Sequence, residues 1–341
     1  MKNRFSLRNK LMIVFGMLIL ASCLTLGIMA VRTARKAVTE KVQAHLIDKA
    51  TDVAEIIDGR VNAFFQLLEG VARMPALRDS SVPFSKKMEL LEEEAKFNSV
   101  LQELYIVDTE GVQHHPDGSR IEYKTDVWFT ETMKGKKYTA EPYCDKTKNN
   151  QMFITFSLPV YDDNKNIVGV LGADVDGLWL SEQIKDIVVG QTGNCSIVGR
   201  TGITIADKDK ELVKKRLNIS EEAKKDRTLQ SLAAFIKMIV ASDISSVGYY
   251  EYEGTKKIAS YATMKTTDWT IAVSAPVYEF MGTVDALRNR MMLTGVTILV
   301  IILISTFFVA GGMIKPVNRI VTALKGIAQG EGDLTVRLPV T

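Results

Sequence analysis

The sequence predicts an α+β protein with a long helix and two tandem units built on antiparallel sheets, placed between two transmembrane helices. Two apolar runs without formal charge mark the membrane segments, one toward each end of the 341-residue chain. A long segment with helical apolar spacing follows the first run. Between the runs, the order strand, turn, strand, helix and further strands occurs twice. This order suggests a duplicated unit with helices on the flanks of each sheet.

The proposed membrane segments are residues 11–31 and residues 291–314. At about 1.5 Å per residue, either helix crosses a hydrocarbon layer roughly 30 Å thick. Residues 1–10 contain basic side chains and no acids, and Lys315 and Arg319 follow the second run. Positive residues favour the cytoplasmic side, so we expect an inner or plasma membrane protein with both ends inside and residues 32–290 outside.

The first run also resembles a cleaved signal peptide, because it has a basic start and an apolar centre. The sequence "LASC" at Leu20–Cys23 resembles a lipoprotein processing site. The apolar run nevertheless continues through Leu24–Val31, and this length favours a retained membrane helix. Cleavage at Cys23 would instead indicate an extracellular adhesion or lipoprotein module.

Residues 32–74 are predicted to form one long helix. No Gly or Pro occurs from Thr33 to Asp58, and the segment ends near Pro75. A helix of some 40 residues spans roughly 60 Å, too long to bury its apolar stripe against one small domain. We expect it to pair with its twin in a homodimer or to support two stacked domains. The stripe contains Val42, Leu46, Ala50, Val53, Ile57, Val61, Phe64 and Leu68.

The first unit, residues 75–189, begins with strand, turn and strand in "LQELYIVDTEGV". A short helix in "DVWFTETMKG" and strands in "YTAEPY", "MFITFSLPVY" and "IVGVLGADV" follow. The second unit, residues 190–277, repeats this order, starting with "NCSIVGRTGITIAD". It continues with a helical stretch at Ser220–Ala241, more strands, and a helix at Tyr278–Arg290 that leads into the second membrane run.

After the second run, Val317, Ile320, Leu324 and Ile327 recur at intervals of three and four residues, as in a parallel helical bundle. Pro316 stands where a helix could restart. Together with Gly332–Leu334 and Arg337, residues 315–341 resemble the first helix and connector of a HAMP domain, the cytoplasmic relay of chemoreceptors and sensor kinases. The resemblance implies a receptor fragment that ends before its output module. A short amphipathic helix on the membrane surface is the alternative.

Several classes of function are not favoured. The net charge of +3 is too small to suggest nucleic-acid binding. The chain has no G-x-S-x-G, H-E-x-x-H or P-loop motif, so we expect no enzyme activity. The three cysteines form no C-x-x-C pair, and we expect no metal and no cofactor.

Residues 33–290 resemble the double Cache sensor domain of methyl-accepting chemotaxis proteins, which consists of two PAS-like Cache subdomains. The best markers are "DVWF", "EPY", "SLPVYDDNKNIVGVLGADV" and "DWTIAVSAP". The resemblance implies a transmembrane chemoreceptor that binds a small ligand outside and relays the signal through HAMP to a chemotaxis kinase and its adaptor. A histidine kinase or diguanylate cyclase with the same front end is the alternative, and only residues after Thr341 would decide.

In this family the membrane-distal subdomain binds the ligand, and one widespread subset binds amino acids. The resemblance implies a site formed by Trp128, Phe129, Tyr143 and Asp174. The family's carboxylate-binding arginine is replaced by Asp126, and an upstream tyrosine by Ile121. Two acids and three aromatic rings suit an organic cation such as an amine better than a carboxylate.

Two alternatives remain beside this prediction. An amino acid could still bind if Arg120 or Lys124 supplied the missing cation. Trp128 could also be ordinary core, with Asp126 as the N-cap of the helix that contains it.

Overall fold

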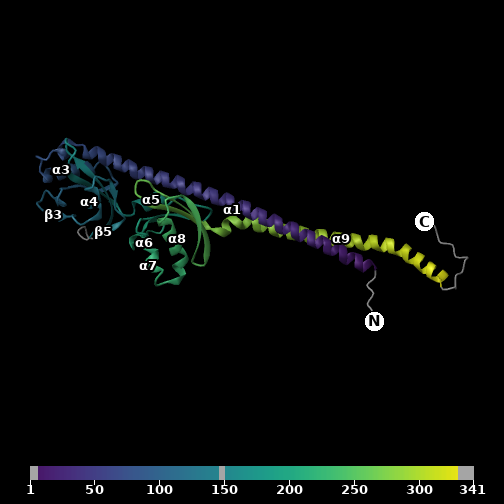
Figure 1. Ribbon diagram of the computed structural model, residues 1–341. Coiled ribbons are helices and arrows are strands. Elements are labelled where there is room, and N and C mark those ends of the chain that lie inside the picture. Colours follow the sequence, from purple (N-terminus) through teal and green to yellow (C-terminus); the bar gives the residue numbers. More distant parts are fainter. Residues whose placement is uncertain (1–6, 146–149, 329–341) are drawn as a thin grey trace. The chain divides into compact units, whose positions relative to one another are not determined.

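The computed structural model describes residues 7–145 and 150–328 (Figure 1). Lys41–Phe280 form one compact unit, and the described residues of Met1–Glu40 and Met281–Thr341 form the other. The first of these contains both sheets and is called the sensor unit below. The second consists of helical segments only and is called the helical unit. The predicted α+β class with a long leading helix and two antiparallel sheets is confirmed.

The helical unit consists of parts of α1 (Leu7–Ala72) and α9 (Val277–Ala328). Each helix contains a segment long and apolar enough to cross a membrane. Contrary to expectation, α9 does not restart at Pro316 but continues through it. Proline removes one backbone donor, and the loss of one hydrogen bond is tolerated within a helix of 52 residues. Gly332–Leu334 and Arg337 lie outside the described residues.

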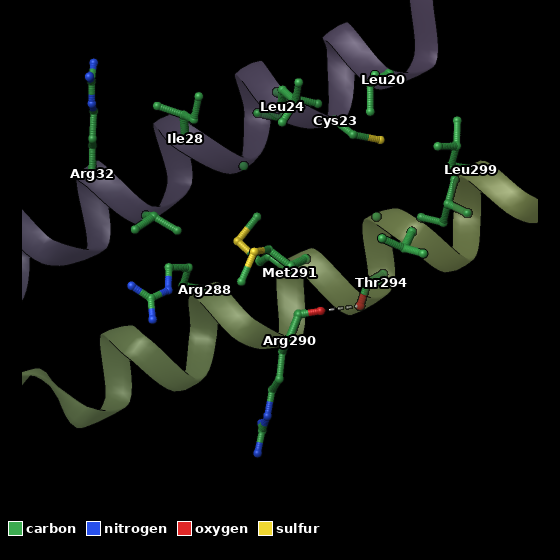
Figure 2. Close-up of a pocket in the computed structure, with 17 residues that line it drawn as sticks. Leu20, Cys23, Leu24, Ile28, Arg32, Arg288, Arg290, Met291, Thr294 and Leu299 are labelled. Carbon is green, nitrogen blue, oxygen red and sulfur yellow. Dashed lines mark hydrogen bonds between the residues drawn. The ribbon is translucent and has the colours of Figure 1, made fainter. Parts of the chain in front are cut away.

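Between α1 and α9 the helical unit has a groove of about 820 Å³ (Figure 2). Leucine, isoleucine, valine and methionine side chains make up most of its lining, Arg32 and Arg288 lie at one end, and the side chain of Arg290 points away from α1. Thr294 turns its hydroxyl back to the carbonyl of Arg290, 2.9 Å away, so the groove gains no free polar group there. Such a surface suits hydrocarbon or another apolar helix.

The first sheet of the sensor unit has the strand order β3-β2-β1-β7-β6-β4, with β5 also paired to β6. All its pairings are antiparallel. The predicted strand "YTAEPY" is two short strands, because Pro142 lacks a donor for the ladder. The strands are β1 (Leu101–Val107), β2 (Val112–His114), β3 (Arg120–Glu122), β4 (Tyr138–Thr139), β5 (Tyr143–Asp145), β6 (Gln151–Tyr161) and β7 (Ile167–Asp176).

The helices of this part are α2 (Pro75–Arg78), α3 (Phe84–Ala95), α4 (Val127–Thr132) and α5 (Trp179–Ile184). Alternation along β6 assigns α1 and α4 to opposite faces of the sheet. Phe156 packs on Phe64 and Phe65 of α1, with ring centroids 4.7 and 5.4 Å apart. The next residue, Ser157, instead bonds the hydroxyl of Thr132 in α4 at 2.7 Å. We call these the α1 face and the α4 face.

The second sheet has the order β10-β11-β12-β8-β9. Its strands are β8 (Asn194–Val198), β9 (Thr204–Asp207), β10 (Ser246–Tyr252), β11 (Thr255–Thr263) and β12 (Thr270–Pro276). The predicted helix at Ser220–Ala241 is interrupted, because Asp226 caps a new turn by accepting from the backbone N–H of Thr228. Its pieces are α7 (Ile219–Glu222), η1 (Arg227–Leu229) and α8 (Gln230–Val240), preceded by α6 (Lys210–Lys214).

One carboxylate joins the loop between the two sheets to the start of α9. Glu279, in the first turn of α9, accepts the backbone N–H of Gln191 at 2.6 Å and that of Thr192 at 3.2 Å. It also accepts the hydroxyl of Thr192. Gly190 precedes this contact in a left-handed conformation with φ of 64°. A side chain there would collide with Glu279 at 2.3 Å, which explains a glycine at this turn.

Candidate functional site

The centre of the candidate site is the carboxylate of Asp174, which is fully buried on the α4 face. Thr155 lies opposite Asp174 across β6 and β7, and its hydroxyl donates to Oδ1 of Asp174 at 2.6 Å. The hydroxyl of Tyr105 approaches the same oxygen at 3.2 Å. Tyr143 of β5 bonds the hydroxyl of Thr155 at 2.8 Å. Strands β1, β5, β6 and β7 therefore contribute to one hydrogen-bonded network.

Tyr105 reaches Asp174 because its register partner on β7 is Gly172. The aromatic ring lies directly across this glycine. A Cβ on Gly172 would lie 2.4 Å from Cε2 of Tyr105, a distance that atoms in contact do not reach. The absence of a side chain at position 172 thus allows a fully buried tyrosine to lie along the sheet and direct its hydroxyl to the carboxylate.

Three aromatic rings form a wall beside this network. Tyr105 and Tyr123 are stacked with centroids 5.9 Å apart, and Trp128 meets Tyr123 at 5.1 Å and Tyr105 at 6.1 Å. Trp128 projects from α4, a helix of one and a half turns that follows the loop containing Tyr123. All three side chains are at most 5% exposed.

Within the described part of the chain, three buried polar atoms near this wall have no hydrogen-bond partner. They are the hydroxyl of Tyr123, the indole N–H of Trp128 and Oε1 of Gln113. The amide nitrogen of Gln113 does bond Glu103, at 3.1 Å. Buried polar groups are nearly always paired, so a cluster of unpaired ones is typical of a binding site rather than of core.

The electrostatic environment is negative. Burial and then the carboxylate of Asp174 raise the pKa of Tyr143, the hydroxyl of Thr155 lowers it, and Asp145 and Asp126 raise it by smaller amounts. Burial also raises the pKa of Tyr123, followed by Asp174, Glu103 and Asp145. Among the described residues, the charged groups that raise the pKa values of these two tyrosines are acids.

Asp126 occupies the N-cap position of α4, but its carboxylate accepts no capping hydrogen bond. It is partly buried. Burial raises its pKa, the nearby indole N–H of Trp128 lowers it although the two groups do not reach hydrogen-bond geometry, and Asp145 raises it again. The backbone of Asp126 thus begins the helix, while its side chain is left near the indole and the other acids.

The predicted residues Trp128, Tyr143, Asp126 and Asp174 are all connected to this cluster by contact or by charge. Phe129 is 4% exposed, and its only ring contact in the described chain is the edge-on packing against Trp128 at 6.1 Å. We therefore assign Phe129 to the packing of the indole rather than to the cluster itself. The sequence prediction did not include six further residues of this cluster: Tyr105, Tyr123, Thr155, Gln113, Glu103 and Asp145. Alternation predicts that Tyr105 and Glu103 share a face, but not which face is the site.

Comparison with known proteins agrees with this architecture. A model of the Cache domain, dCache_1, matches residues 30–284, and the chain therefore belongs to the Cache domain family. The methyl-accepting chemotaxis protein PscA of Pseudomonas syringae pv. tomato is 22% identical over 316 residues, which cover 90% of this chain and 47% of that protein. The chain thus spans about half the length of the curated relatives it matches first.

Two solved structures have the same fold. The ligand-binding domain of the Pseudomonas fluorescens chemoreceptor CtaA, in complex with L-isoleucine, aligns with a TM-score of 0.56 and 20% identity, over 74% of this chain and 99% of that one. The extracellular domain of the histidine kinase mmHK1S-Z2 aligns with a TM-score of 0.55 and 17% identity, over 72% and 99%. The chain therefore has a chemoreceptor-type Cache sensor domain flanked by two candidate membrane helices.

Proposed function

We propose that this chain is the sensory part of a transmembrane chemoreceptor whose membrane-distal subdomain binds a small organic cation. The observation that carries the proposal is the set of acids around Tyr143 and Tyr123, with Asp174 at its centre. An amine or a quaternary ammonium compound is the ligand class. Asp174 would hold the charged nitrogen, and Tyr105, Tyr123 and Trp128 would surround it.

The energetic argument compares a cation with a zwitterion. An ammonium group would give Asp174 a charge-assisted hydrogen bond, stronger than the bonds from neutral hydroxyls. Each ring face adds about 0.5–2 kcal/mol for a desolvated cation. The α-carboxylate of an amino acid would be repelled by the same acids. The family resemblance leads one to expect an arginine where this chain has Asp126, so the usual carboxylate partner is missing.

The sequence suggested Arg120 and Lys124 as compensating cations, and both of these side chains are exposed. The backbone of Lys124 packs closely on Gly111, whose added Cβ would lie 2.7 Å from the Lys124 Cα. Moving this segment toward the site would disturb that contact. This argues against a compensating cation from Arg120 or Lys124 and is consistent with a cationic ligand.

Signal transfer belongs to the same proposal. Basic residues at the cytoplasmic flanks orient the sensor unit outward. A homodimer would relay the ligand signal through the segment that resembles HAMP to a chemotaxis kinase and its adaptor. Ligand binding shifts such an equilibrium only if one conformation binds more tightly than the other.

A histidine kinase is the second candidate, because sensor domains of histidine kinases align with this chain as well as those of chemoreceptors do. A long methylatable coiled coil after Thr341 would indicate the chemoreceptor. An ATP-binding module would indicate the kinase.

Calorimetric titration of the purified chain tests the ligand class with propylamine, tetramethylammonium, L-alanine and acetate. We expect the two cations to bind and acetate not to bind. Asp174→Asn should abolish cation binding, while the exposed Asp186→Asn serves as a matched control. Unchanged cation binding in Asp174→Asn would remove the site. Tight L-alanine binding that Arg120→Ala or Lys124→Ala abolishes would replace the proposal by an amino acid receptor.

A further inference from the structure

A second cavity lies within the sensor unit, where α1, α2 and β6 meet. Its volume is about 490 Å³, within the range of small-molecule sites. None of its lining residues belongs to the acidic cluster around Asp174. The lining consists of Glu69, Ala72, Arg73, Arg78, Gly135, Lys137, Leu158, Pro159 and Tyr161.

The charged part of this lining contains three cations and one acid. Glu69 is shared by two of the cations: Lys137 contacts Oε1, and Arg73 approaches Oε2 at 3.9 Å. The third, Arg78, donates to the carbonyl of Tyr161 at 3.0 Å and to Asp163 at 2.5 Å. Arg73 and Lys137 thus compete for a single carboxylate, and their remaining donors are available to an anion.

The floor of the cavity is apolar. Ala72 and Leu158 are 8% and 3% exposed, and Pro159 is also buried. An inorganic anion would gain little from such a floor, whereas the hydrocarbon part of an organic acid would be removed from water by it. Cations at the rim and aliphatic groups at the base fit a molecule with a carboxylate and a short carbon chain.

We propose that this cavity is a second ligand site, specific for short organic carboxylates. The carboxylate lies between Arg73 and Lys137 and takes over part of the role of Glu69, while the carbon chain lies on Ala72 and Leu158. Leu158 belongs to the α1 face, as Phe156 does, whereas Thr155 and Asp174 belong to the α4 face. Asp174 and its partners do not line the cavity, so the two sites share no residue, and their opposite charges select opposite classes of ligand.

The test is calorimetric titration of the detergent-solubilised chain with glutarate, butyrate and inorganic phosphate. We expect both carboxylates to bind and phosphate to bind at least about tenfold more weakly. Lys137→Met should weaken glutarate binding roughly fivefold to tenfold, the effect of about 1 kcal/mol or slightly more. Glu69→Gln should strengthen it severalfold, because the competing carboxylate charge is gone.

The matched control is Lys136→Met. Lys136 neighbours Lys137 but pairs with Glu131 at 4.0 Å and does not line the cavity, so its removal should leave glutarate affinity unchanged. Absence of carboxylate binding at about 10 mM overturns the proposal, as does an affinity that neither Lys137→Met nor Glu69→Gln alters. Phosphate binding as tight as glutarate overturns the assignment to organic acids.

Asp174→Asn separates this inference from the proposed function. It should abolish amine binding and leave glutarate binding intact, since Asp174 does not line the second cavity. Loss of glutarate binding in Asp174→Asn would contradict a separate carboxylate site.

Discussion

Replacing Gly172 by alanine should destabilise the sensor unit and weaken cation binding at the same time. The new Cβ would lie 2.4 Å from Cε2 and 2.6 Å from Cζ of Tyr105. Tyr105 is fully buried, so its ring cannot swing into solvent without opening the core. A shift of the ring would also draw its hydroxyl away from Asp174, to which the bond is already 3.2 Å long.

The magnitude follows from two opposing contributions. Overpacking in a well-packed core costs about 1–3 kcal/mol. Alanine in place of glycine within a strand returns about 0.5–1 kcal/mol of backbone entropy. We therefore expect a loss of roughly 0.5–2 kcal/mol in the free energy of unfolding, measured by denaturant titration at constant m-value.

A change of sign makes this prediction specific. In a Tyr105→Ala background the collision is absent, and Gly172→Ala should then stabilise the chain by about 0.5 kcal/mol. Gly59→Ala on α1 is the control, because its Cβ would meet no atom within 4 Å, and it should be stabilising in either background. The reasoning is refuted if Gly172→Ala has the same effect with and without the Tyr105 ring.

Three further predictions concern other parts of the chain. Lys87 is 1% exposed and donates to the carbonyl of Leu77, and burial lowers its pKa. The unfolded chain therefore binds more protons at this lysine, and the free energy of unfolding should rise as the pH approaches 10.5. Lys87→Met should reduce the slope of the free energy of unfolding against pH. Glu279→Ala should speed hydrogen exchange at the Thr192 amide and cost about 1 kcal/mol, and normal protection there would exclude the contact. In a Cys144→Ser background, a cysteine at Ser119 should react with a membrane-impermeant maleimide in intact cells; reaction only after lysis would reverse the proposed topology.

The sequence was most informative where one periodic pattern continued over many residues. The apolar spacing from Val42 to Leu68 predicted the sensor part of α1, whose stripe residues Leu46, Ile57 and Leu68 are fully buried. Pro316 shows the limit of local rules, because a proline that favours a helix start also fits inside a helix whose neighbouring turns stay hydrogen-bonded.

The candidate site was predictable only in part, because its members are separated in sequence and meet through strand pairing. Asp174 was identified by resemblance, but its neighbour Tyr105 is 69 residues away and depends on the register of β1 against β7. That register cannot be read from either strand alone. The sequence left two roles open for Asp126, ligand contact and N-cap. The structure places its backbone at the start of α4, while its carboxylate makes no capping hydrogen bond.

The three cysteines of the chain have very different surroundings, and this has a practical consequence. Cys144 is exposed on β5 directly beside Tyr143, whereas Cys195 is buried, and burial followed by the charge of Asp207 raises its pKa to about 12. Cys23 lies in the first candidate membrane span. Since the thiolate is the reactive species, a water-soluble alkylating dye should attach at Cys144 and not at Cys195. The natural chain thus offers a position for a fluorescent reporter next to the candidate site, without any engineered residue.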